Sequence, residues 1–135
     1  MSAATDIKQD RKYTRDHEWA KTDGGEVLVG ITAFAVDQLG DITMVSIDVK
    51  PGDSLTAHKP FGTIESVKTL SDLFAPLSGR VTRVNDALEN SPELVNEDCW
   101  EKGWMIAIEP SAREREEPEL LEAGAYAKHV AESAH

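Results

Sequence analysis

The chain has 135 residues, and its 25 acidic and 14 basic side chains give a formal net charge of −11. This balance argues against nucleic-acid binding, because phosphate contact needs a basic face, and it disfavours adsorption to anionic membranes. No apolar run is long enough to span a membrane.

The single cysteine, Cys99, excludes an internal disulfide and indicates a reducing compartment, so we expect a free thiol. Residues 1–10 lack the hydrophobic core of a signal peptide and do not resemble an organellar presequence. We therefore expect a cytoplasmic protein of bacterial type.

The first predicted element follows a polar N-terminal segment, residues 1–12, which we expect to be flexible. A single domain is expected from residue 13 to residue 135. Within it, residues 18–21 and 26–31 flank the turn signal Asp23–Gly25 and predict a β-hairpin.

A short helix is predicted over residues 33–39, with Thr32 as its N-cap and Gly40 as its stop. Residues 41–48 then predict a strand whose two faces both carry apolar side chains. Such a strand is either buried on both sides or bends between its faces.

Residues 60–84 contain three strand candidates, which are broken at Lys68 and again at residues 76–79. Short turns or helical pieces are predicted at residues 85–88 and 92–96.

The last strand is predicted over residues 103–108, and a C-terminal helix from about residue 118 with a break near Gly124. The segment Gly40–Val45 has a similar copy in Gly79–Val84, and each copy is followed by a turn and a glycine-led strand. Two similar β-rich halves indicate a sandwich or flattened barrel with pseudo-two-fold symmetry.

Enzyme-like motifs are absent from the sequence. His17 and Glu18 begin a zinc-protease motif, but Lys21 stands where the second histidine would be needed. The other histidines show no metal-ligand spacing, so no metal site is expected. Cys99 has no identifiable activating base, and no glycine-rich phosphate loop occurs.

Lys68 is the only cation between Lys59 and Arg80, and it falls where the chain should reverse. A terminal amine on a flexible stem at a hairpin tip suits covalent attachment of a carrier group. From the local pattern alone, a solvated loop lysine is the simpler interpretation.

The wider sequence resembles the H-protein family of the glycine cleavage system. The residues that carry the resemblance are Tyr13–Trp19, Val29–Thr32, Leu39–Ile42, Glu65–Lys68, Ala75–Gly79, Val84–Asn85, Pro92–Asn96 and Gly103–Trp104. This ordered set covers about ninety residues and is highly specific. Thr69, where alanine is more usual, and Asp98–Trp100 depart from the family pattern without touching the attachment lysine.

The resemblance implies a mainly β, lipoyl-domain-like barrel–sandwich hybrid of two antiparallel sheets, with short helices and a C-terminal helix. It implies lipoate joined to Lys68 in amide linkage, and a carrier that is not itself an enzyme. Glycine decarboxylase would load an aminomethyl group, aminomethyltransferase would remove it, and dihydrolipoyl dehydrogenase would reoxidise the arm.

The resemblance also implies roles for four further residues. Glu65 and Gly79 match positions implicated in recognition by lipoylating enzymes, although Glu65 could be a solvated strand residue and Gly79 a turn residue. Glu18 and Asp72 are expected near a cleft that protects the aminomethyl arm, with Trp19 as an aromatic neighbour that excludes water. Without the family, both acids read as ordinary surface residues.

Other carriers fit less well. Biotinyl domains usually place methionines beside the lysine, whereas Val67 and Thr69 stand here, and the alanine- and proline-rich linkers of multienzyme lipoyl domains are missing. Two alternatives remain open: an unmodified interaction or regulatory protein that retains the fold, and a donor of lipoate to other enzymes.

Overall fold

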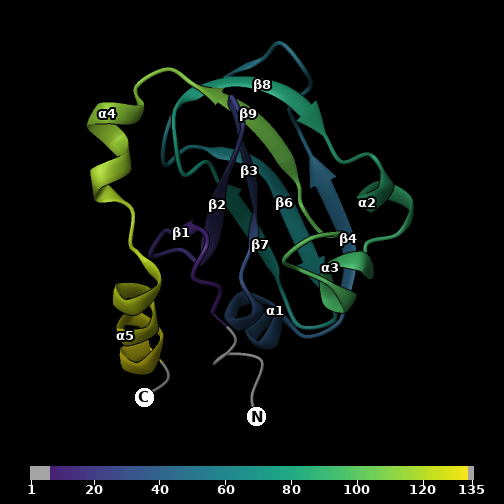
Figure 1. Cartoon of the computed structure of the whole chain (residues 1–135). Coiled ribbons are helices and arrows are strands. Elements are labelled where there is room, and N and C mark those ends of the chain that lie inside the picture. The colour runs from purple at the N-terminus through teal and green to yellow at the C-terminus, as the bar shows by residue number, and fades with distance from the viewer. Residues whose placement is uncertain (1–6, 134–135) are drawn as a thin grey trace.

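Two antiparallel β-sheets form the body of the computed structural model, which describes residues 7–133 (Figure 1). The six-stranded sheet has the order β1-β2-β3-β9-β8-β5, with strands Lys12–Tyr13, Glu18–Asp23, Glu26–Ile31, Ile106–Pro110, Gly79–Val84 and Ser54–Leu55. The three-stranded sheet has the order β4-β6-β7, with strands Ile42–Ile47, Pro60–Ser66 and Leu70–Phe74. The helices are α1 Ala33–Leu39, α2 Ala87–Asn90, α3 Leu94–Glu97, α4 Arg113–Glu116 and α5 Ala123–Ser133, and a 3₁₀ turn covers Glu117–Glu119. The expected mainly β class with two antiparallel sheets is confirmed.

The predicted first hairpin and the predicted helix after it are both present. Strands β2 and β3 pair in continuous register from Glu18 with Ile31 to Asp23 with Glu26. The Thr32 hydroxyl accepts a hydrogen bond from the Ala35 amide at 3.2 Å and so caps α1. Gly40 ends the helix with φ of +81°, a conformation that side chains disfavour.

Strand β4 bends, which was one of the two structures that its sequence allowed. Its pairing with β6 shifts between Ile42 and Met44, as in a β-bulge. Ile42 and Val45 are buried, whereas Met44 is 44% exposed. The bulge therefore lets two apolar residues an odd number of positions apart reach the same core.

The two similar halves of the sequence occupy the two sheets. Strand β4 pairs with β6 in the small sheet, and β8, from the matching segment, pairs with β9 in the large sheet. A glycine in each half allows close strand contact: a Cβ on Gly62 would lie 2.3 Å from the Ser46 carbonyl oxygen. A Cβ on Gly79 would lie 2.2 Å from the Glu109 carbonyl oxygen.

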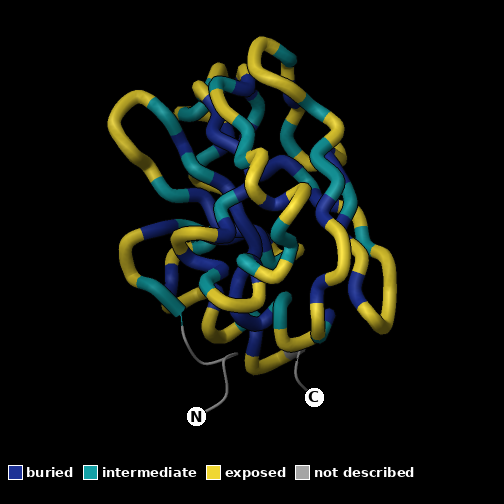
Figure 2. The backbone as a smooth tube through the Cα atoms, turned by 90° about the vertical axis from the view of Figure 1, so that its right-hand side faces the viewer, coloured by how far each residue is buried: buried dark blue, intermediate teal, exposed yellow. Residues whose placement is uncertain are grey.

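The main hydrophobic core lies between the two sheets, and a second aromatic cluster lies beside α5. Figure 2 shows the buried backbone gathered in the interior and the exposed segments mostly in the loops. The main core includes Val29, Ile64 and Ile108, each 1% exposed or less. The second cluster includes Tyr13 and Tyr126, whose rings stack 4.5 Å apart.

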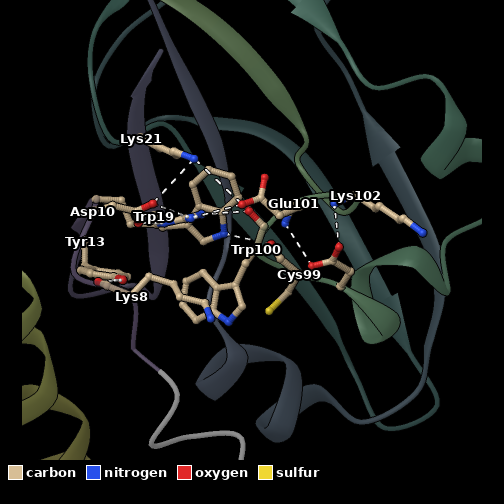
Figure 3. A network of polar contacts seen from close by, with 11 residues as sticks. Lys8, Asp10, Tyr13, Trp19, Lys21, Cys99, Trp100, Glu101 and Lys102 are labelled. Carbon is tan, nitrogen blue, oxygen red and sulfur yellow. Dashed lines mark hydrogen bonds and ion pairs between the residues drawn. The ribbon is translucent and has the colours of Figure 1, made fainter.

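Part of the N-terminal segment expected to be flexible packs onto the domain. Arg11 is 5% exposed, and its guanidinium lies 4.7 Å from the Trp19 ring and 5.2 Å from the Trp100 ring. It also donates a hydrogen bond to the Trp100 carbonyl, and the Trp19 indole donates to the Cys99 carbonyl (Figure 3). Residues 1–6 lie outside the described residues.

Two predicted boundaries near the C-terminus are wrong. Strand β9 begins at Ile106 and not at Gly103. Gly103 instead packs against α3, because a Cβ added to Gly103 would lie only 3.0 Å from the Val95 Cα. Helix α5 begins at Ala123 and contains Gly124. The chain before it is extended, since Leu121 exchanges two backbone hydrogen bonds with Tyr13. Within residues 7–133, no helix combines the length and apolar character that crossing a membrane requires.

Gly62→Ala should destabilise the protein by about 2–3 kcal/mol, because the new methyl group would overlap the Ser46 carbonyl. Gly124→Ala is the matched control: no atom lies within 4 Å of its added Cβ, and alanine in a helix is neutral or stabilising by up to about 1 kcal/mol. Urea denaturation followed by circular dichroism measures both. Equal stability of the two variants would contradict the close approach of β4 and β6.

Candidate functional site

Lys68 lies at the tip of the β6–β7 hairpin, where the sequence predicted a chain reversal. Strand β6 ends at Ser66, and β7 begins at Leu70. The Ser66 amide donates to the Thr69 carbonyl at 2.8 Å and closes the turn. Lys68 is exposed, and its neighbour Val67 is 66% exposed, so the amine is open to a large partner.

The backbone of the tip is held in place by Ser66, a residue whose role the sequence analysis missed. Its hydroxyl accepts hydrogen bonds from the Lys68 and Thr69 amides, both at 3.2 Å. The Val67 amide donates to the Asp41 carbonyl at 3.0 Å, which ties the tip to the start of β4. The Lys68 stem lies over Gly40, where an added Cβ would be 3.4 Å from Lys68 Cε. The signal for Ser66 was its place two residues before the turn lysine.

A pocket of about 190 Å³ opens between three elements: the turn before β2, helix α1 and the β6–β7 hairpin. Its apolar lining includes Ile31, Phe34 and Ile64. Glu18 and Asp72, which the sequence analysis placed near a cleft, both line it. Leu39, the neighbour of the glycine beneath the Lys68 stem, lines it as well.

Glu18 is buried within this pocket, with only 2% of its surface exposed. The Thr14 hydroxyl donates to its Oε1 at 2.7 Å, and the Phe74 amide donates to its Oε2 at 3.3 Å. Burial raises the pKa of Glu18 from 4.5 to about 8, and these two hydrogen bonds oppose the rise. At neutral pH the buried carboxyl of the folded protein is therefore largely protonated.

The aromatic neighbour of Glu18 in the pocket is Phe34, not Trp19, so that expectation was wrong. Successive side chains of a strand point to opposite faces. Trp19 accordingly packs with Cys99 and Trp100 in the second cluster. Phe34 comes from α1 and lies 4.6 Å from the His17 ring, between ring centroids.

The two expected recognition residues lie in different sheets. Glu65 is exposed on β6 and pairs with Leu70, one position beyond the turn. Gly79 begins β8, which Figure 1 shows across the top of the molecule, whereas the β6–β7 connection lies at the bottom. The tight contact of Gly79 with the Glu109 backbone is sufficient to explain why no side chain is present there.

Among the residues that the structure describes, no group of three or more histidine, cysteine, aspartate or glutamate side chains could hold a metal ion. Cys99 is buried at 8% exposure and lies in the second cluster, away from the pocket lining.

Comparison with known proteins decides the family. The model of the family described as "Glycine cleavage H-protein" matches residues 11–133. The chain belongs to the glycine cleavage H-protein family. The expectation from the sequence, a lipoyl-bearing shuttle of the glycine cleavage system, agrees with this membership.

Named relatives match most of this chain. The glycine cleavage system H protein of Oceanobacillus iheyensis is 52% identical over 120 residues, which are 89% of this chain and 94% of the relative. That of Anaeromyxobacter sp. strain K is 49% identical over 128 residues, 94% of this chain and 98% of the relative. The crystal structure of the H protein from Mycobacterium marinum matches with a TM-score of 0.82 at 36% identity, covering 96% of this chain and all of that one.

The raised pKa of Glu18 predicts a specific pH dependence of stability. An unfolded glutamate ionises near 4.5 and the folded one near 8, so the unfolded state binds fewer protons in between and stability falls as pH rises through this window. Glu18→Gln removes this loss. The unfolding free energy of the variant minus that of the unsubstituted protein should therefore be larger at pH 8.5 than at pH 5 by roughly 2–4 kcal/mol.

Urea denaturation at the two pH values measures this gain. Asp72→Asn is the control for removing a carboxyl group from the same pocket, because Asp72 lines that pocket but is exposed. A Glu18→Gln difference that is the same at both pH values would contradict the raised pKa.

Proposed function

We propose that this protein carries lipoate in amide linkage on Lys68 and transports an aminomethyl group from glycine decarboxylase to aminomethyltransferase, with reoxidation by dihydrolipoyl dehydrogenase. The observation that carries the proposal is an exposed amine on a fixed hairpin tip beside a pocket with a buried carboxyl. The lipoyl group supplies the dithiolane that bears the cargo. The chain itself acts as a carrier, without catalytic residues of its own.

The residues around Lys68 fit such an arm. The stem of the lysine already lies over Gly40, next to Leu39 at the pocket. Ile31, Phe34 and Ile64 give the pocket an apolar wall suited to a hydrocarbon chain. The acids of the same pocket suit an ammonium group at the end of that chain.

Glu18 is proposed to keep this amine protonated. A positive charge in the pocket lowers the pKa of the buried carboxyl and is itself stabilised by the carboxylate. The proton then resides on the amine, whose nitrogen has no free electron pair with which to expel the neighbouring sulfur. Asp72, exposed at the same pocket, adds negative potential from the solvent side.

Tethering explains why a whole protein is used to carry a small group. An attached arm presents its end at a high effective concentration to each partner enzyme in turn. The net charge of −11 favours partners with basic docking surfaces, because opposite charge accelerates encounter. The single cysteine supports a cytoplasmic location for this exchange.

Lys68→Arg should abolish lipoylation while leaving the fold intact, because a guanidinium keeps the charge but does not form the amide. Intact-mass measurement after expression in lipoate-competent cells is the test. Lys59→Arg, an exposed lysine just before β6, is the matched control and should retain the lipoyl mass increment. Lipoylation of the Lys68→Arg variant, or none of the unsubstituted protein, would overturn the proposal in favour of an unmodified interaction protein.

Glu65→Ala should slow lipoylation roughly tenfold, as expected when one charged contact to a modifying enzyme is lost. The residue is exposed on β6 near the tip, so stability should change little. Glu109→Ala, an exposed strand glutamate of the other sheet, is the control for loss of charge. Equal lipoylation rates in a purified ligase assay would reduce Glu65 to a surface residue.

A further inference from the structure

Tyr126 of helix α5 is a fully buried tyrosine whose hydroxyl contacts His17, which lines the pocket, and Thr32, the N-cap of α1. Its oxygen lies 2.8 Å from His17 Nδ1 and 2.7 Å from the Thr32 hydroxyl. Burial raises the pKa of Tyr126, so the group is a neutral hydroxyl. When the His17 ring is neutral with its proton on Nε2, Tyr126 donates to His17 and accepts from Thr32.

Thr32 determines where helix α1 begins. Its hydroxyl caps the helix by accepting from the Ala35 amide. Helix α1 supplies Phe34 and Leu39 to the pocket. The Thr32 amide also donates to the His17 carbonyl at 3.0 Å, so the start of α1 and the turn before β2 are joined twice, once through the backbone and once through Tyr126.

His17 belongs to the tight turn that presents Glu18. Its φ is +71°, an uncommon conformation for a residue other than glycine. The Thr14 hydroxyl accepts from the Glu18 amide at 3.1 Å and donates to the Glu18 carboxyl, so the turn and the carboxyl are one unit. A displacement of this turn therefore moves the Glu18 carboxyl.

Helix α5 contacts this turn at a second point, through His129. His129, three residues after Tyr126 and so on the same helix face, has its Nε2 2.9 Å from the Arg15 carbonyl oxygen. Its ring also stacks on His17 at 5.3 Å between centroids. The C-terminal helix thus contacts the turn through both Tyr126 and His129, although it supplies no side chain to the pocket lining.

We propose that Tyr126 is a positioning residue for the pocket: its hydroxyl locks the turn of His17 to the N-terminus of α1 and so holds Glu18 where it faces the bound amine. The inference rests on the proposed function of Glu18. It assigns to the C-terminal helix a role in protecting the cargo, in addition to its packing.

Tyr13 provides a matched control within the same cluster. It is also fully buried, and its ring stacks on that of Tyr126. Its hydroxyl, however, donates to the Lys8 carbonyl at 2.6 Å, and it does not line the pocket. Tyr13→Phe and Tyr126→Phe therefore each remove a phenolic hydroxyl from the same aromatic cluster, but it is the Tyr126 hydroxyl that contacts the pocket residue His17.

The first measurement needs no loaded arm. The ionisation of Glu18 is followed by ¹³C NMR of carboxyl-labelled glutamate in the full-length protein, with Glu18→Gln to assign the signal. In Tyr126→Phe the turn should loosen and water should reach the carboxyl, so the Glu18 midpoint should fall from about 8 by at least about one pH unit. Tyr13→Phe should leave it unchanged. An unchanged midpoint in Tyr126→Phe overturns the positioning role, whatever Glu18 does.

The second measurement uses the lipoylated protein loaded with its aminomethyl group, and times spontaneous release. Tyr126→Phe should shorten the lifetime about fivefold to tenfold, the effect of one lost hydrogen bond, while Tyr13→Phe should match the unsubstituted protein. Glu18→Gln separates the two hypotheses. If Glu18→Gln accelerates release and Tyr126→Phe does not, the positioning role of Tyr126 is wrong, and the role of Glu18 in keeping the amine protonated stands. If Glu18→Gln has no effect on release, that role of Glu18 is wrong. The NMR midpoint alone then decides whether Tyr126 positions Glu18.

Discussion

The Glu18 carboxyl joins the two sheets of the protein through a hydrogen bond. Glu18 belongs to β2 of the six-stranded sheet, and the Phe74 amide that binds it belongs to β7, an edge strand of the three-stranded sheet. A buried carboxyl without partners would be strongly destabilising, so the Thr14 hydroxyl and this edge amide are needed to retain it. The same geometry leaves a pocket beside the carboxyl, bounded by both sheets and by α1. The site is thus a product of how the sheets meet, not of any one motif.

The hairpin tip that bears Lys68 has the opposite character, with a fixed backbone and an exposed side chain. Ser66 and Asp41 hold the amides on either side of the tip, while the Lys68 side chain is exposed. Fixing the tip limits the volume that a tethered group can explore, and the Lys68 stem lies over Gly40, the neighbour of the pocket residue Leu39. A carrier needs both properties, because its cargo must be protected between partners and released to each of them.

Local chemistry made much of the fold predictable, and long-range contacts made the rest unpredictable. The cap at Thr32, the stop at Gly40 and the reversal at Lys68 depend on neighbours in sequence, and all three are found. The family confirms the shuttle role expected from the ordered motifs, whereas the modification of Lys68 and the roles of Glu18, Glu65, Gly79 and Asp72 stay predictions. The burial of Glu18 depends on Phe74, 56 residues away. The burial of Glu116 depends in the same way on Ser78, 38 residues away. No local pattern contains such partners, and the start of α5 likewise depends on the pairing of Leu121 with Tyr13.

The burial of Cys99 has a consequence for a protein that carries a dithiolane. Thiol–disulfide exchange requires an accessible thiolate, and its rate falls steeply when the sulfur is shielded. Cys99 is 8% exposed and packed in the second cluster with Trp19 and Trp100. A surface cysteine on the same chain would capture the oxidised arm of a neighbouring molecule and link carriers into mixed-disulfide dimers. Shielding the only thiol of the chain keeps each oxidised arm available for reduction by its partner enzymes instead.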